Sequence, residues 1–144
     1  MGITIRCKKT YRSIDLGTGG FLRLRRKVSE LAGEPLSSHY AKLLDKSCFM
    51  SEKESKAFYD EFNATTQKLL EEKKIDIKIV DFLLQSDEIG RIRYGACKNI
   101  LNVIGDYDDD IRYGYCGRRN CAKFADFKEI LRDCVKTKSD MIWD

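Results

Sequence analysis

Apolar and polar residues alternate in two short stretches near the start of the 144-residue chain. These stretches cover residues 3–7 and 12–16, and the polar residues 8–11 lie between them. Alternation with a period of two is typical of a strand that buries one face. The pattern therefore predicts a β-hairpin at the start of the chain.

A glycine-rich segment at residues 17–20 ends the alternation, and a helical period follows it. Spacings of three and four residues place one set of apolar side chains on a single helix face. Gly33 is predicted to end this helix just before Pro35. The apolar face consists of Phe21, Leu24, Val28 and Leu31, and the opposite, basic face of Arg23, Arg26 and Lys27.

The middle of the chain predicts three further helices. The first is short and has His39 beside its apolar face, and the second begins at a capping box formed by Ser51 and Glu54. Residues 75–84 are apolar nearly all round and predict a central buried helix, although alternation at their start leaves a short strand open. The inward positions are Leu36, Tyr40, Leu43 and Leu44 in the short helix, and Phe58, Phe62, Thr66 and Leu69 in the long one.

Two more helices and a strand are predicted toward the C-terminus. Ser86, followed by Asp87 and Glu88, is predicted to cap the first helix, and Asn120 the second. Residues 141–143 are predicted to close the chain as an edge strand. The buried positions are Ile89, Ile92, Ala96, Ile100 and Val103 in the first helix and Phe124, Phe127, Leu131 and Cys134 in the second.

The sum of these elements is an α+β protein. The pattern predicts a mostly helical single domain over residues 1–144 with a small, mainly antiparallel sheet. Within it, the hexapeptide IRYGAC at 92–97 returns as IRYGYC at 111–116, with five of six positions identical. The first copy is predicted to be helical and the second a strand. Because the flanks differ, this is local reuse or chance and not a solenoid repeat.

Composition is that of a soluble globular domain, with 42% hydrophobic and 35% charged residues. No run reaches the length of a membrane span and no signal-peptide pattern is present, so we expect a cytoplasmic protein without membrane contact. In that compartment the six cysteines are expected to be buried thiols or metal ligands before they are disulfides.

Three motifs resemble known sites and fail on closer inspection. The segment 15–21 resembles the glycine-rich first motif of S-adenosylmethionine-dependent methyltransferases, but such folds need a second parallel strand after the helix. Residues 106–110 imitate a calcium loop, yet Ile111 and Gly117 stand where glycine and glutamate are required. Cys116 and Cys121, with Cys97 and Cys134, have poor spacing for zinc. We therefore predict no metal, no cofactor and no catalytic residue.

Arg118 and Arg119 are the most informative charged pair. They precede the last helix, where the helix dipole disfavours cations, and glycines lie nearby. The other glycine-led helix start has the same character, so a phosphate or carboxylate could bind between the two if they converge. This candidate anion site consists of Gly17, Thr18, Gly19, Gly20, Arg23, Arg118 and Arg119. The alternative is that Arg118 and Arg119 pair with surface acids such as Asp126.

The positive charge is concentrated at the start of the chain. The net charge is +4, but residues 1–33 hold eight Lys and Arg against two acids. Arg23, Arg25, Arg26 and Lys27 could contact nucleic-acid phosphates. No helix-turn-helix or zinc-finger spacing accompanies them, so a solvated basic helix face is the favoured interpretation.

Several blocks together resemble a family of short proteins from bacterial genomes and phages that carries no assigned activity. The blocks are Ser13 to Gly17, Gly19 to Phe21, Ile92 to Gly95, and Asp106 to Gly117. The resemblance implies a bacterial or phage origin and transfers no site residue. We expect a non-enzymatic accessory or protein-binding module, with a small anionic ligand or nucleotide, and then nucleic acid, as the alternative partners.

Overall fold

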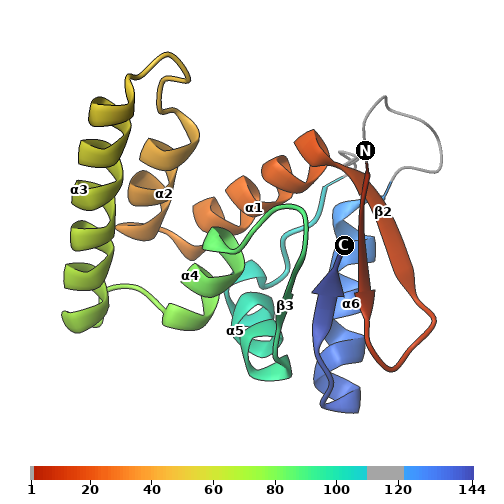
Figure 1. The fold of residues 1–144 in the computed structure, drawn as a ribbon. Coiled ribbons are helices and arrows are strands. Elements are labelled where there is room, and N and C mark those ends of the chain that lie inside the picture. Colours follow the sequence, from red (N-terminus) through yellow and green to blue (C-terminus); the bar gives the residue numbers. More distant parts are fainter. Residues whose placement is uncertain (1, 110–121) are drawn as a thin grey trace.

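The computed structural model describes residues 2–109 and 122–144. Six helices and a four-stranded antiparallel sheet lie in these residues (Figure 1), which confirms the predicted α+β class. The strands are β1 (Gly2–Cys7), β2 (Ser13–Gly17), β3 (Gly90–Ile92) and β4 (Met141–Trp143). The helices are α1 (Thr18–Ala32), α2 (Leu36–Leu44), α3 (Glu52–Glu71), α4 (Ile77–Leu84), α5 (Tyr94–Ile104) and α6 (Phe124–Thr137). None of these helices is long and apolar enough to span a membrane.

The predicted N-terminal hairpin is confirmed. β1 and β2 pair antiparallel, with Ile5 opposite Ile14. Ile3 and Ile5 are buried, whereas Arg6 on the other face of β1 is exposed. One face of the sheet therefore lies in the core and the other faces outward, as the period of two requires.

β4 lies inside the sheet and not at its edge. The strand order is β2-β1-β4-β3, and Trp143 of β4 has Ile5 as its partner on one side and Gly90 on the other. The predicted edge position is wrong, because the pattern of a short apolar stretch does not indicate how many strands pair with it. Its second neighbour, β3, was itself predicted to be helical.

The helix predicted from Ser86 begins only at Tyr94, and Ile89, predicted to be buried, is 68% exposed. Long-range hydrogen bonds explain the difference. The Ser86 carbonyl accepts from Arg25 Nη2 at 3.2 Å and from Trp143 Nε1 at 3.0 Å, so it is held away from a helical position. The first copy of the hexapeptide therefore spans the junction of β3 and α5, and the second copy lies outside the described residues.

The outer edge of β3 is covered by a side chain. Arg91 directs its backbone groups away from β4: its N–H donates to Gln85 Oε1 at 3.0 Å, and its carbonyl accepts from Gln85 Nε2 at 2.7 Å. One amide side chain thus occupies the positions that a further strand would use.

Residues 77–84 form a helix, but it is buried on one side only. Val80, Phe82 and Leu83 are in the core, whereas Ile77 is 63% exposed and Leu84 38%. The prediction of a helix is confirmed, and the prediction that it is buried all round is wrong. No strand forms at its start, because the Asp76 side chain accepts from the N–H of Lys78 at 2.8 Å and caps the helix.

The other helices follow the sequence pattern closely. Gly33 follows the last residue of α1, and Ser51 caps α3 by accepting from the N–H of Glu54 at 3.1 Å. The N-cap residue of α6 is Lys123, whose N–H donates to Asp126 Oδ2 at 2.8 Å. The predicted cap at Asn120 is therefore wrong, and Asn120 itself lies outside the described residues. The apolar face of α6 is confirmed, with Phe124, Phe127, Leu131 and Cys134 all buried.

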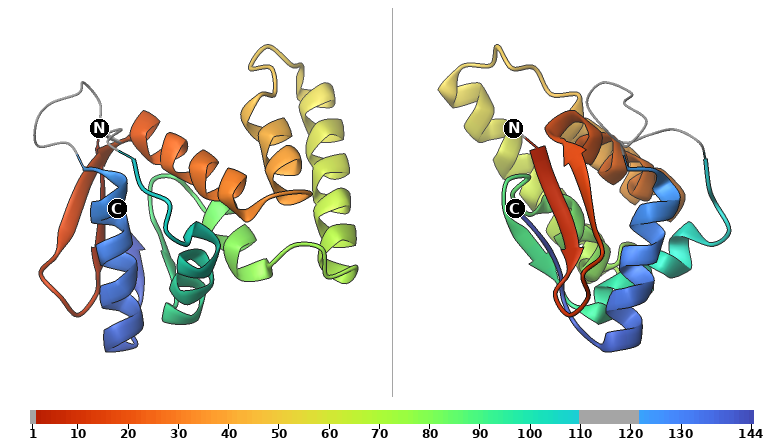
Figure 2. Two further views of the ribbon diagram at one scale, coloured as in Figure 1. Left: turned by 180° about the vertical axis from the view of Figure 1, so that it is seen from behind. Right: turned by 90° about the vertical axis from the view of Figure 1, so that its right-hand side faces the viewer.

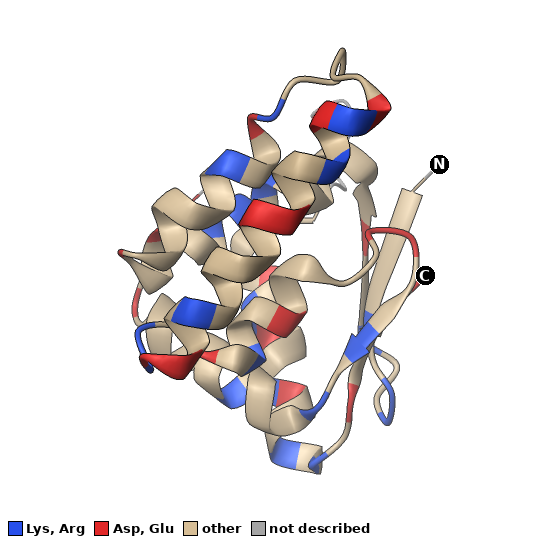
Figure 3. Ribbon diagram, turned by 60° about the vertical axis from the view of Figure 1, so that its left-hand side comes forward, with Lys and Arg blue, Asp and Glu red and all other residues tan. Residues whose placement is uncertain are grey.

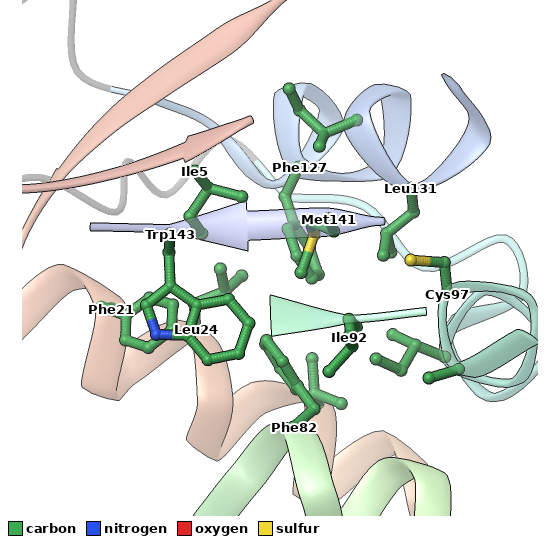
Figure 4. Packing of buried hydrophobic residues seen from close by; sticks show 14 of the residues in the cluster. Ile5, Phe21, Leu24, Phe82, Ile92, Cys97, Phe127, Leu131, Met141 and Trp143 are labelled. Atoms are coloured by element: carbon green, nitrogen blue, oxygen red, sulfur yellow. The ribbon is translucent and has the colours of Figure 1, made fainter. Parts of the chain in front are cut away.

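An aromatic cluster joins the helices to the sheet. The rings of Phe21, Phe82 and Trp143 lie 5.6–6.1 Å apart between centroids, and they come from α1, α4 and β4 (Figure 4). Arg25 is 3% exposed, and its guanidinium carbon lies 4.3 Å from the centre of the Phe21 ring. Arg25 is therefore a core residue, and its assignment to a nucleic-acid-binding face is wrong.

Gly90 and Gly19 provide a matched test of this core. A Cβ at Gly90 would lie 2.2 Å from Trp143 Cζ2, whereas a Cβ at Gly19 would meet no described atom within 4 Å. We expect Gly90→Ala to lower the free energy of unfolding by about 1–3 kcal/mol, because the indole must move. Gly19→Ala, in a helix, should be neutral or stabilising by up to about 1 kcal/mol. Urea unfolding of both variants checks this, and equal losses would contradict the packing around Trp143.

Candidate functional site

The structure places part of the predicted anion site. Gly17 precedes α1, Thr18, Gly19 and Gly20 form its first turn without an acidic residue, and Arg23 is exposed on the next turn. Arg118 and Arg119 lie outside the described residues. Convergence of the two helix starts therefore stays a prediction. The antiparallel pairing of β2 with β1, and the direct passage from α1 to α2, confirm that this glycine segment lacks a methyltransferase context among the described residues.

The described cysteines are free thiols. Cys7, Cys97 and Cys134 are buried together, while Cys48 is exposed, and Cys116 and Cys121 lie outside the described residues. Burial acts to raise the pKa of Cys7, but hydrogen bonds from Ser139, the Lys9 backbone and Thr137 outweigh it and lower the pKa to about 7. Among residues 2–109 and 122–144 no three His, Cys, Asp or Glu side chains could hold a metal ion.

Much of the basic charge of the N-terminal third is paired. Arg26 Nη2 lies 2.9 Å from Asp45 Oδ1, Lys27 Nζ lies 3.1 Å from Glu30, and Arg12 Nε lies 3.0 Å from Asp133. With Arg25 buried, fewer cations are left to contact phosphates than the sequence suggests. Lys and Arg also alternate with Asp and Glu over the helices in Figure 3, so no single-sign stripe runs along them.

α2 and α3 form an arm at the end of the molecule farthest from the hairpin. Figure 2 shows this α2–α3 arm on one side and the sheet with α6 on the other, with α1 between them. α3 has 20 residues, but only Phe62 and Thr66 are buried. Phe58 and Leu69 were predicted to face inward and are half-buried. The apolar stripe of α3 is therefore only partly covered.

Four rings in the arm form a continuous row, hereafter the aromatic row. His39 stacks on Phe62 with ring centres 4.2 Å apart and planes 7° apart. Phe62 is followed by Phe58 at 6.1 Å and 17°, and Phe58 by Tyr59 at 5.4 Å and 83°. His39 is 5% exposed and Tyr59 38%, so the row leads from the interior of the arm to its surface.

Hydrogen bonds determine which nitrogen of His39 carries the proton. The Thr66 hydroxyl donates to the carbonyl of Phe62 at 2.8 Å, so its oxygen accepts from His39 Nε2 at 2.6 Å. Nε2 is then the protonated nitrogen, and Nδ1 is an acceptor. Nδ1 is buried and has no hydrogen-bond partner among the described residues. Burial lowers the pKa of His39, with a smaller contribution from Lys42, which favours this neutral form.

A cavity of about 440 Å³, hereafter the α2–α3 pocket, lies between the two helices. Its volume is in the range of small-molecule sites. Lys42, Asp45 and Glu61 supply charged groups, and Asp45 is paired with Arg26. The remaining lining residues are His39, Phe58, Phe62 and Thr65. The pocket therefore combines aromatic walls, a balanced set of charges and a buried acceptor without a partner.

A second cavity, of about 420 Å³, lies at the start of α5. Arg93 precedes the helix and makes no side-chain cap, the first turn holds no acidic residue, and Lys78 Nζ lies 3.0 Å from where a Cβ on Gly95 would be. Two cations thus gather at the positive end of a helix dipole, which is unfavourable without a negative group nearby. Asp81 also lines the cavity and offsets part of this charge.

Sequence patterns identified parts of the α2–α3 pocket but not their assembly, and they did not indicate the cavity at the start of α5. His39 was assigned to the edge of an apolar face, and Phe58, Phe62 and Thr66 to the inside of another helix. Nothing in the spacing indicates that these two faces meet. Lys78 and Arg93 carried no signal, because Arg93 was predicted to lie within a helix and not before its first residue.

Comparisons of the chain with protein-family models, with curated proteins and with solved structures found no match.

The lowered pKa of His39 predicts that the stability of the protein depends on pH. Its pKa is lowered in the folded protein from the ordinary value of 6.5, so the unfolded chain takes up its proton first. The stabilisation from neutral His39 is complete above that value and is lost as the pH falls through the folded pKa. We expect the urea midpoint to fall between about pH 7.5 and about pH 5.5 in the wild type, and the change to be smaller in His39→Phe.

His39 is the one histidine of the chain, but Cys7, whose pKa is lowered to about 7, also titrates in this window. The difference between the wild type and His39→Phe therefore isolates the contribution of the imidazole. The charged groups that line the pocket with it are Lys42, Asp45 and Glu61. Carboxylates titrate mainly below this window, and hydrogen bonds lower the pKa of Glu34 and Glu72 further. An identical pH slope in wild type and His39→Phe would contradict a neutral, buried imidazole.

Proposed function

We propose that this protein is a non-enzymatic binding protein that recognises another protein through its α2–α3 arm. One observation carries the proposal: the aromatic row leads from the protein surface to His39, a residue that lines the α2–α3 pocket and whose buried Nδ1 has no partner among the described residues. The bacterial or phage origin and the cytoplasmic location suggested by the sequence belong to the same proposal.

Exposed aromatic residues elsewhere in the arm support a protein as the partner. Tyr59 is 38% exposed beside Phe58, and Phe49, between α2 and α3, is 93% exposed. Aromatic side chains are enriched at protein interfaces relative to the rest of a protein surface. A small ligand in the pocket alone would leave both residues without a role.

The hydrogen bonds of His39 support binding over catalysis. Its Nε2 donates to Thr66, whose own hydrogen is already committed to the carbonyl of Phe62. The Thr66 proton therefore points away from His39, and His39 Nε2 is itself a donor, so the pair is not arranged as the base and nucleophile that acyl transfer requires.

A peptide-display selection against the purified protein tests the proposal without knowledge of the natural partner. We expect enriched peptides that share a motif, and we expect Phe58→Ala or Tyr59→Ala to weaken their binding about tenfold or more, as truncation of an interface aromatic does. Tyr11→Ala is the matched control, since Tyr11 is fully exposed on the hairpin. Absence of enriched peptides, or equal loss in the Tyr11 variant, would contradict recognition by the arm.

A second candidate function is the binding of a small anion at the start of α5. The supporting observation is the approach of Lys78 and Arg93 to an uncapped helix N-terminus in a cavity. This location differs from the predicted site at Gly17–Gly20 and Arg23, which also remains a proposal.

Thermal unfolding in phosphate or nucleotide, against chloride at equal ionic strength, distinguishes the two anion sites. If α5 binds the anion, saturation at about 100 times Kd should add about 2.7 kcal/mol of stability, and Lys78→Ala/Arg93→Ala should abolish this gain. Arg23→Ala and Arg118→Ala/Arg119→Ala test the other site in the same way, and Lys53→Ala is a surface control on α3. A gain that survives Lys78→Ala/Arg93→Ala would contradict the site at α5.

A further inference from the structure

The α2–α3 pocket also indicates which side chain of a partner it accepts. We infer that it takes the indole ring of a tryptophan, which stacks along the aromatic row and donates its N–H to His39 Nδ1. The inference rests on the proposed function, because it assigns the chemistry of the same arm.

The hydrogen-bonding state of the pocket selects for a donor. His39 Nδ1 is an acceptor with no partner among the described residues, and His39 is 5% exposed. A buried acceptor left unpaired costs free energy that a matching donor recovers. Of the aromatic side chains, tryptophan carries a ring N–H that donates and cannot accept, so it matches Nδ1 without leaving a polar atom of its own unpaired.

The walls of the pocket select for a flat apolar ring. Phe58 and Phe62 are nearly parallel, with planes 17° apart, and Phe62 is parallel to His39 within 7°. Aromatic rings that enter such a row gain from offset stacking or edge contacts in addition to burial.

The charges of the pocket do not favour an ionic ligand. Lys42 and Glu61 carry opposite charges, and Asp45 is held by Arg26 at 2.9 Å. A cationic or anionic side chain would therefore find both signs around it. A neutral ring with one polar edge meets no such conflict.

Entry of the ring requires a local adjustment at the mouth of the pocket. Nδ1 lies beneath the surface of the arm, whereas Phe58 is half-buried and Lys42 is exposed. Phe58, Lys42 and the exposed Glu61 are therefore side chains at the mouth that have room to move aside. Binding should therefore perturb α2 and α3 while the aromatic cluster around Trp143 stays unchanged.

NMR titration of the full chain with indole and 1-methylindole tests the inference, since the added methyl group removes the donor and keeps the ring. We expect indole to bind about tenfold more tightly than 1-methylindole, the ratio for a hydrogen bond to a buried group. We expect His39→Phe, which keeps a ring in place but has no acceptor, to bind both compounds equally. If His39→Phe does not fold, Phe58→Ala is the second variant, and it should weaken both compounds alike.

Peptides that contain tryptophan identify the source of the ring. A peptide with tryptophan should bind at least as tightly as free indole and about tenfold more tightly than the same peptide with 1-methyltryptophan. Equal binding of indole and 1-methylindole, or no binding of either, would overturn the inference but leave recognition of other peptides by the arm intact. Binding of free indole without binding of tryptophan peptides would overturn the assignment to a protein partner. If selected peptides fail to bind the arm at all, the proposed function itself fails.

Discussion

The buried guanidinium of Arg25 holds together parts of the chain that lie far apart in sequence. Its carbon lies over the ring of Phe21 at 4.3 Å and within 5.6 Å of the ring centres of Phe82 and Trp143. Its Nη2 donates to Ser86, which also accepts from Trp143. α1, α4, β4 and the segment before β3 therefore meet at one cation. Burial lowers the pKa of Arg25 to about 10, so it stays charged near neutral pH, and the aromatic faces supply much of the stabilisation that water would give.

This cluster explains where sequence patterns succeed and where they fail. The hairpin, α1, α2, α3 and the buried face of α6 follow from local periodicity, because each buries one face of a regular element. β3 and the late start of α5 depend on Ser86. Its carbonyl accepts hydrogen bonds from Arg25 and Trp143, which are 61 and 57 positions away in the sequence. A local reading of Ser86 as a helix cap could not include those bonds. Arg25 was misassigned for the same reason, since charge alone places an arginine at the surface unless its aromatic neighbours are known.

The candidate site was predictable only in its parts. Sequence spacing gave the inward face of α3 and the place of His39 beside the face of α2, but it could not bring Phe62 onto the imidazole ring. That contact depends on the packing of α2 against α3, and the tautomer of His39 depends in turn on Thr66. α2 is tied to the core, because its Leu36 and Tyr40 pack in the same cluster as Phe21 and Trp143. α3 buries only Phe62 and Thr66, so it is the helix of the arm that can shift with less effect on that core.

The side chain of Gln85 limits how other chains can associate with the sheet at β3. An exposed strand edge is the usual place for a foreign peptide to add to a sheet by backbone hydrogen bonds. At β3 that edge is closed, because the Gln85 amide already pairs with both backbone groups of Arg91. β3 therefore resists extension of the sheet from that side, whether by a foreign peptide or by a second copy. A partner on this side of the protein must therefore be recognised through contacts with its side chains. Such contacts depend on the partner's sequence, whereas main-chain hydrogen bonds do not.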